Sequence, residues 1–135
     1  MRKDIMSSPS EAKRILERAL KELDEGVILN DNLKIRDACE KGWLATVKSV
    51  ENFLIAKGFK PPETHVERRR ALRELEKMES KMKALGILDR VEARRSMLHA
   101  DGFYSGILNP DEVKEELKKV EELINDIEFL SSARG

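Results

Sequence analysis

The chain has 135 residues, of which 39% are charged and 40% are hydrophobic, and its formal net charge is zero. This length fits one domain with its own core, residues 1–135, and the hydrophobic fraction is too high for a disordered charged tail. The sequence holds no signal-like apolar core at its start and no apolar run near the roughly 18 residues of a membrane span, so we expect a cytoplasmic protein without membrane contact.

Two helices are predicted in the first half of the chain. Residues 8–11, Ser-Pro-Ser-Glu, place a cap and a first-turn proline before an apolar stripe that Gly26 ends. The second helix begins near residues 30–32 and runs to Lys57, with apolar residues at three- and four-residue steps. Gly42 lies inside it at a cost of about 1 kcal/mol relative to Ala, which a close helix crossing would explain.

Three further helices follow. The capping box of residues 64–67 opens a helix whose near-heptad stripe lasts to Gly86. Residues 89–92 open a shorter fourth helix that ends near Gly102. Residues 109–112, Asn-Pro-Asp-Glu, start the last helix, which carries one apolar face to about residue 130.

The expected fold is all-α, because no segment alternates like a strand or carries a hairpin dipeptide. Short connections between amphipathic helices favour antiparallel neighbours, which predicts an up-and-down antiparallel bundle of four long helices plus one shorter helix. A helical-repeat solenoid is the alternative, but the sequence shows no fixed period. Residues 1–7 and 131–135 are expected to be flexible.

The charge is unevenly distributed along the chain. Residues 60–100 carry 11 basic and 7 acidic side chains, whereas residues 101–135 carry 4 and 9. A basic middle and an acidic end fit either nucleic-acid contact or pairing within and between subunits. The abundance of Lys, Glu and Arg and the absence of Gln are typical of proteins from hot environments, so we expect a thermophilic source.

The sequence predicts no cofactor and no metal site. Cys39 is the only cysteine and fits a small buried position, and the two histidines, His65 and His99, are distant in sequence. Phosphate-binding glycine loops, helical metal-ligand motifs and nucleophile elbows are missing, which excludes most common enzyme classes.

The two histidines have different predicted settings. His65 lies in the first turn of a capped helix, where we expect an exposed side chain and a disfavoured imidazolium. His99 lies near the end of the fourth helix, where the helix dipole favours the charged form. Two interpretations of His99 stay open: it is a partly buried histidine that hydrogen-bonds to a carbonyl or to Asp101, or it is a catalytic group.

Arg94 and His99, separated by four residues, form the only constellation in the sequence that suggests chemistry. At about 100° per residue, Arg95 and His99 share a helix face, whereas Arg94 and His99 differ by about 140° around the axis. Arg94 can therefore meet His99 only through long side chains or across two subunits.

This motif and its context resemble the HEPN superfamily, the higher-eukaryote and prokaryote nucleotide-binding domains. Their signature is an arginine, four to six residues and then a histidine on a late helix of an up-and-down bundle. Residues 98–108 and 111–113 look like the corresponding part of an archaeal repeat-element branch of that superfamily, and residues 41–43, Lys-Gly-Trp, are similar to it as well.

The resemblance implies a metal-independent ribonuclease site assembled across a homodimer. His99 would act as general base toward a ribose 2′-hydroxyl, and Arg94 would stabilise the charge on the phosphate. We take Arg95, Asp101 and Tyr104 as candidate binding residues. The resemblance also points to a minimal nucleotidyltransferase as a partner protein.

Two departures from the family pattern favour binding over cleavage. Active members usually have a small polar residue after the motif arginine, where this chain has Arg95, and the toxin branch has a tyrosine where this chain has Asp101. An acidic neighbour repels RNA phosphates. We therefore expect a dimeric nucleotide-binding or protein-interaction module, and a ribonuclease with a site formed by Arg94 and His99 is the alternative.

Two other features have competing interpretations. Residues 68–70, three arginines, together with Arg73 would suit a phosphate backbone, but a solvated helix face is the favoured interpretation. The aromatic side chains would suit base stacking, but most fall on core stripes, so we favour packing. They are Trp43, Phe53, Phe59, Phe103 and Tyr104.

Overall fold

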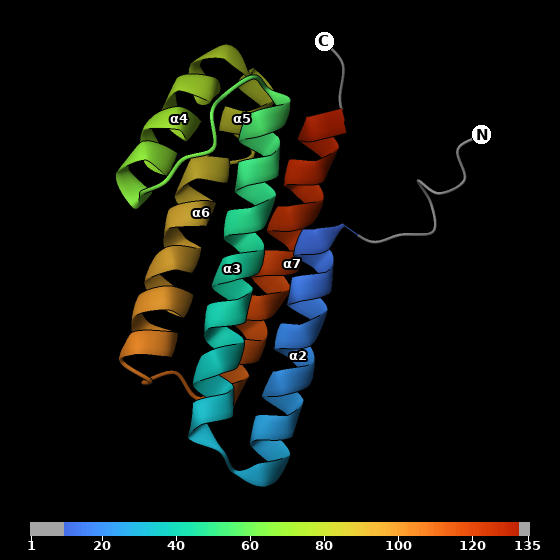
Figure 1. The fold of residues 1–135 in the computed structure, drawn as a ribbon, viewed down its shortest axis with the longest axis vertical. Coiled ribbons are helices and arrows are strands. Elements are labelled where there is room, and N and C mark those ends of the chain that lie inside the picture. The colour runs from blue at the N-terminus through green and yellow to red at the C-terminus, as the bar shows by residue number, and fades with distance from the viewer. Residues whose placement is uncertain (1–9, 133–135) are drawn as a thin grey trace, which may run out of the picture.

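The computed structural model describes residues 10–132, and within that range the chain is helical and contains no strand (Figure 1). This confirms the all-α prediction. No helix in this range is long and apolar enough to cross a bilayer. The elements in chain order are α2 (Glu11–Leu29), α3 (Asn32–Ala56), α4 (His65–Met78), α5 (Ser80–Ala84), α6 (Ile87–Arg94), the π-helix η1 (Arg95–Tyr104) and α7 (Pro110–Ser132).

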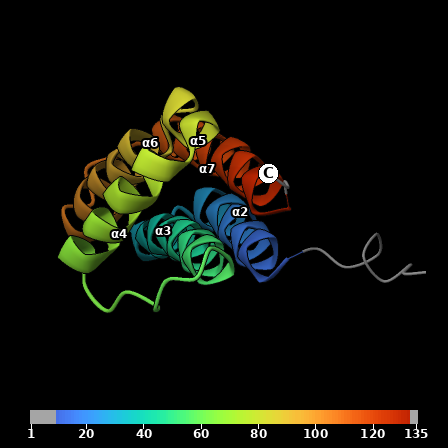
Figure 2. The same cartoon turned by 90° about the horizontal axis from the view of Figure 1, so that it is seen from above.

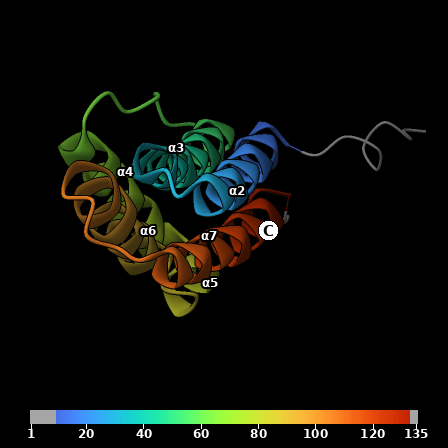
Figure 3. The ribbon, with the colours of Figure 1, turned by 90° about the horizontal axis from the view of Figure 1, so that it is seen from below.

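Four rods form the bundle: α2, α3, the continuous α6–η1 rod and α7. Successive rods run in opposite directions, and all four lie along the long axis of the molecule (Figure 1). Viewed along that axis, α4 lies outside the four, beside α6 and α3 (Figures 2 and 3). The link after α3 runs back along the bundle, so α4 rises in the same sense as α3 (Figure 1).

The first two helices, α2 and α3, form a hairpin whose first arm is longer than the sequence predicted. Ser10 caps α2 by accepting from the N–H of Lys13 at 3.2 Å, while residues 8 and 9 lie outside the described range. The predicted end at Gly26 is wrong, because α2 continues to a left-handed Asn30. Gly26 instead serves the packing of the hairpin, since a Cβ there would lie 2.9 Å from the side chain of Ile35.

The third predicted helix is broken into α4 and α5. Its cap is confirmed, since the Thr64 hydroxyl accepts from the N–H of Glu67 at 3.0 Å. Glu79 is extended, with φ −127° and ψ 94°, so the predicted continuous stripe to Gly86 is wrong. No proline or glycine marks this break, which was therefore missed in the sequence. The interruption leaves Met78 exposed before the chain turns inward again.

The fourth helix is longer than predicted at both ends. It begins at Ile87 after a left-handed Gly86 rather than at Asp89, and it extends past Gly102 to Tyr104. Its second half is wound as a π-helix, an uncommon geometry that often occurs at functional sites. The short predicted element thus becomes one of the four rods of the bundle.

The last helix begins as predicted. Asn109 and Glu112 form a reciprocal capping box, with each side chain accepting from the other residue's N–H at 2.9 Å. The helix α7 includes Ser131 and Ser132, which were expected to be flexible. The other residues predicted to be flexible, 1–7 and 133–135, lie outside the described range.

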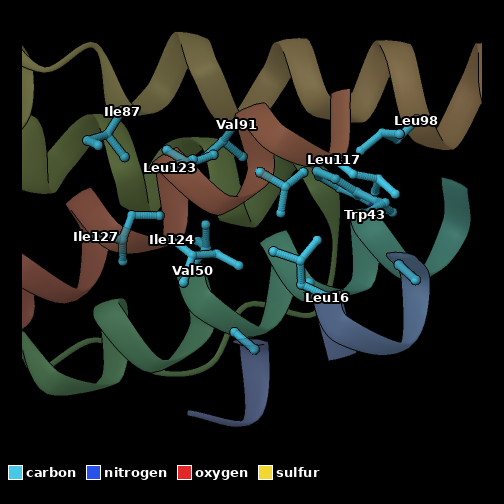
Figure 4. Packing of buried hydrophobic residues seen from close by; sticks show 14 of the residues in the cluster. Leu16, Trp43, Val50, Ile87, Val91, Leu98, Leu117, Leu123, Ile124 and Ile127 are labelled. Atoms are coloured by element: carbon cyan, nitrogen blue, oxygen red, sulfur yellow. The ribbon is translucent and has the colours of Figure 1, made fainter. Parts of the chain in front are cut away.

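The core fills the space between the four rods, as Figure 4 shows for side chains from all of them. The predicted close crossing at Gly42 is confirmed, because a Cβ there would collide with Leu117 of α7 and lie 3.3 Å from Leu98 of η1. Trp43 and Phe53 are buried, as the packing interpretation predicts. This crossing fixes η1 against α3 and so positions the residues of the candidate site.

Candidate functional site

Arg94 does not face His99. Its Nε lies 2.8 Å from Oε1 of Glu116 on α7, and the two side chains are only 8% and 5% exposed. The N–H is not aligned for a hydrogen bond, so the contact is an ion pair. Lys119 adds a second, more exposed positive charge 3.5 Å from the same carboxylate. Arg94 is therefore held inside the bundle, between α6 and α7.

His99 turns instead toward α3. Its Nδ1 lies 2.9 Å from Oε1 of Glu40, and both side chains are partly buried. The sequence suggested a carbonyl or Asp101 as the partner of His99, and that suggestion is wrong. A carboxylate on Nδ1 orients the imidazole and leaves Nε2 available, as in acid–base sites of many enzymes.

Two aromatic neighbours and a second histidine surround His99. The ring of His65, from the start of α4, is 5.7 Å from that of His99 and meets it edge-on. The ring of Tyr104 is 4.9 Å away, and that of Trp43 lies beneath at 6.0 Å. We call His65, His99, Trp43, Tyr104, Glu40 and Arg68 the histidine cluster.

The π-helical winding explains why Tyr104 reaches His99. The two residues are five apart, which in an α-helix would place them about 140° apart around the axis. Bonds from residue i to i+5 bring such residues onto one face, and the bond from Ser105 N–H to the Ala100 carbonyl at 2.9 Å has this spacing. The winding therefore makes Tyr104 and His99 neighbours.

Arg68 is the charged centre of the cluster. It is buried, its Nη1 lies 3.0 Å from Nδ1 of His65, and its guanidinium carbon lies 5.4 Å above the Trp43 ring. Such a cation over an indole face is stabilising. Burial lowers the pKa of the Arg68 side chain. Arg68 is thus buried, which neither interpretation of residues 68–70 predicted. Arg70 and Arg73 are exposed.

Burial also lowers the pKa of His65 below its ordinary value of 6.5, and the charges of Arg95 and Arg68 lower it further. His65 was expected to be an exposed side chain, and the structure instead places it half-buried in the cluster. The sequence predicted that the charged form of His65 is disfavoured, and the lowered pKa agrees with this prediction. The main cause is burial rather than the helix end alone.

The three candidate binding residues differ in their exposure and in their contacts. Arg95 is half-exposed, 3.9 Å from Glu92, and its charge acts on His65. Tyr104 is 65% exposed. Asp101 contributes its carbonyl, which accepts from the Ile107 N–H at 3.0 Å.

Arg36 of α3 holds the end of η1 in place. Its Nε donates to the Phe103 carbonyl and its Nη2 to the Tyr104 carbonyl, both at 2.8 Å. These carbonyls have no partner further along the helix, since η1 ends there. Arg36 therefore positions Tyr104 beside His99.

Sequence reasoning missed Glu40 and Arg36 as site residues, and for Arg68 it favoured a solvated helix face over a binding role. One signal was available: Arg36, Glu40 and Trp43 recur at four- and three-residue steps, so they share one face of α3. Nothing in the sequence indicated that His65 would meet that face, because the approach of α4 depends on tertiary packing.

Apart from the Glu40 carboxylate, the polar groups here are the two imidazoles, the Tyr104 phenol, the Arg68 guanidinium and, beside the cluster, the guanidinium of Arg95. These groups hydrogen-bond to and neutralise phosphate oxygens, and an exposed aromatic ring can stack on a base. No group of three or more His, Cys, Asp or Glu side chains between residues 10 and 132 is arranged to hold a metal ion.

One family model matches the chain. It is described as Domain of unknown function (DUF5618) and covers residues 5–129. No curated protein and no solved structure matches at a significant level. Because the match spans nearly the whole bundle, including every residue of the histidine cluster, the chain belongs to the DUF5618 family.

Proposed function

We propose that this chain is a helical nucleotide-binding module of HEPN-like type that binds single-stranded RNA through the histidine cluster. The observation that carries the proposal is the convergence of His65, His99 and exposed Tyr104 beside the positive charges of Arg68 and Arg95. Guanidinium groups attract phosphate, and a tyrosine ring stacks on bases of any sequence.

The test is RNA binding by fluorescence anisotropy with a labelled single-stranded oligonucleotide. We expect Tyr104→Ala to weaken binding by about 1–3 kcal/mol, the usual worth of one stacked base. We expect Arg95→Ala to weaken binding and to reduce the salt slope by about 1. Lys118→Ala is the matched control, because Lys118 lines the groove between α2 and α7. Equal effects of all three variants would refute the proposed surface.

Ribonuclease activity is the second candidate, and the pairing of His99 with Glu40 supports it. In this form His99 removes the proton of a ribose 2′-hydroxyl, and a guanidinium stabilises the phosphate. A site that uses Arg94 across a dimer would first have to break its ion pair with Glu116. Cleavage of labelled RNA in the presence of a metal chelator, lost in His99→Ala, would establish the activity.

We also propose that the protein is a cytoplasmic homodimer and that it comes from a thermophilic archaeon. The turn between α2 and α3 supports self-association, because it exposes the apolar side chains of Val27, Ile28, Leu29 and Leu33. Light scattering tests the dimer, and Ile28→Glu should shift it to the monomer. Co-purification tests the further proposal of a nucleotidyltransferase partner.

A further inference from the structure

Hydrogen bonds fix which nitrogen of the His65 ring carries the proton. The Nδ1 atom lies 3.0 Å from Nη1 of Arg68, and a guanidinium has only donors to offer. Nδ1 must therefore accept this bond, so the neutral ring carries its proton on Nε2. Arg68 cannot lose its proton in exchange, because a guanidinium stays charged in proteins. His65 is a neutral imidazole with an outward Nε2–H donor.

His99 has the opposite arrangement. Its Nδ1 lies 2.9 Å from Oε1 of Glu40, and an ionised carboxylate only accepts hydrogen bonds. Nδ1 therefore carries the proton, and in the neutral ring Nε2 holds a free lone pair. Neutral His99 is thus a hydrogen-bond acceptor at Nε2, and its ring centroid lies 5.7 Å from that of His65, the Nε2–H donor.

Both Nε2 atoms are open to a ligand. Neither makes a hydrogen bond to another residue of the described range, and neither is among the buried polar atoms without a partner. The two ring centroids are 5.7 Å apart. Rings this close can bind two neighbouring groups of one ligand, since each hydrogen bond spans about 2.8–3.0 Å.

We propose that His65 and His99 form a ribose-phosphate reader that is complete within one chain. His65 Nε2–H donates to a phosphate oxygen, and His99 Nε2 accepts from the neighbouring 2′-hydroxyl. The inference rests on the proposed RNA-binding function and assigns His65 and Arg68 roles in it. Arg68 is a positioning residue, since it acts through the His65 ring.

The surrounding charges suit this ligand. Arg68 and Arg95 place positive charge beside His65, where the phosphate would lie, and His65 begins the 14-residue helix α4, whose amino end favours anions. Glu40 is on the other side of the His99 ring, bound to Nδ1. A 2′-hydroxyl supplies the proton that the His99 lone pair needs, and DNA has no such group.

The experiment compares three oligonucleotides of one sequence: single-stranded RNA, the same RNA with 2′-O-methyl groups, and DNA. The methylated RNA keeps the 2′-oxygen but has no proton to donate. We expect RNA to bind about tenfold more tightly than either, because the other two ligands lack the proton for one hydrogen bond to His99 Nε2. His99→Ala should remove this preference, whereas His65→Ala should weaken all three ligands together. Lys118 lines the groove between α2 and α7, so Lys118→Ala should change neither the affinity for these ligands nor the preference for RNA.

Imidazole ¹⁵N chemical shifts of the wild-type protein give a second measurement that needs no variant to fold. We expect His65 protonated at Nε2 and neutral His99 protonated at Nδ1, and we expect both Nε2 signals to move when the RNA is added. A His65 ring protonated at Nδ1 would overturn the inference. The inference would also be overturned if RNA and its methylated form bound with equal affinity while Tyr104→Ala still weakened binding. Absence of binding to all three ligands would instead overturn the proposed function.

Discussion

Arg94 and Glu116 form an ion pair at 2.8 Å between two side chains that are almost entirely buried. We predict that Arg94→Ala lowers the free energy of unfolding by up to about 3–5 kcal/mol, because it leaves the buried Glu116 carboxylate with only the more exposed Lys119 as a partner. Chemical denaturation measures this loss. The double variant Arg94→Met, Glu116→Leu should recover most of it, since two apolar side chains remove both buried charges. An Arg94→Ala protein of wild-type stability that had lost RNA cleavage would contradict this structural role.

Arg36→Ala should release the end of η1. The change removes two hydrogen bonds to the carbonyls of Phe103 and Tyr104, and each charged bond contributes about 1.5–3 kcal/mol. Amide hydrogen exchange of residues 103–107 should accelerate more than that of α7. RNA affinity should fall as well, because Tyr104 is no longer held beside His99. Lys34→Ala, which removes a half-exposed cation of the same helix that pairs with Glu25 and not with η1, is the control.

The stability of the fold should depend on pH through His65. Its folded-state pKa lies below the ordinary 6.5, so the unfolded chain binds this proton more readily. The free energy of unfolding is then greatest above pH 6.5 and falls as the pH drops through 6.5 toward the folded-state value. His65→Asn should remove this part of the slope. A variant that loses stability at low pH more steeply than the wild type would contradict the prediction.

Cys39 should be unreactive in the folded protein. Burial, together with the charges of Glu40 and Glu116, raises the pKa of its thiol to about 11. Only the thiolate is nucleophilic, so a thiol reagent at pH 8 should label the chain slowly in buffer and rapidly in denaturant. Rapid labelling of the native protein would show that α3 and η1 separate readily at this point.

Gly102→Ala should destabilise the contact between η1 and α3. An added Cβ would lie 2.6 Å from Sγ and 2.8 Å from Cβ of Cys39, so the two helices must move apart. We expect a loss of about 1–3 kcal/mol in the free energy of unfolding, the usual cost of an overpacked core. Ser96→Ala, an exposed change in the same element, should stay within about 0.5 kcal/mol of wild type.

Local patterns in the sequence predicted the helices where their signals are short-range. The capping boxes at Thr64 and Asn109 appear as expected, because a side chain three residues away satisfies the first backbone N–H groups. The crossing at Gly42 was also predicted, since a glycine inside a helix needs a close neighbour. The break at Glu79 and the passage of α2 through Gly26 had no local signal of this kind.

The sequence by itself determined an all-α chain with amphipathic helices and singled out Arg94 and His99 as chemically suggestive. Only the tertiary structure decided what these side chains do. The π-winding of η1 places Tyr104 beside His99, the packing of α4 on α3 brings His65 there, and the approach of α7 holds Arg94 on Glu116. Helix formation depends on neighbours within one turn, whereas these contacts depend on how whole helices pack.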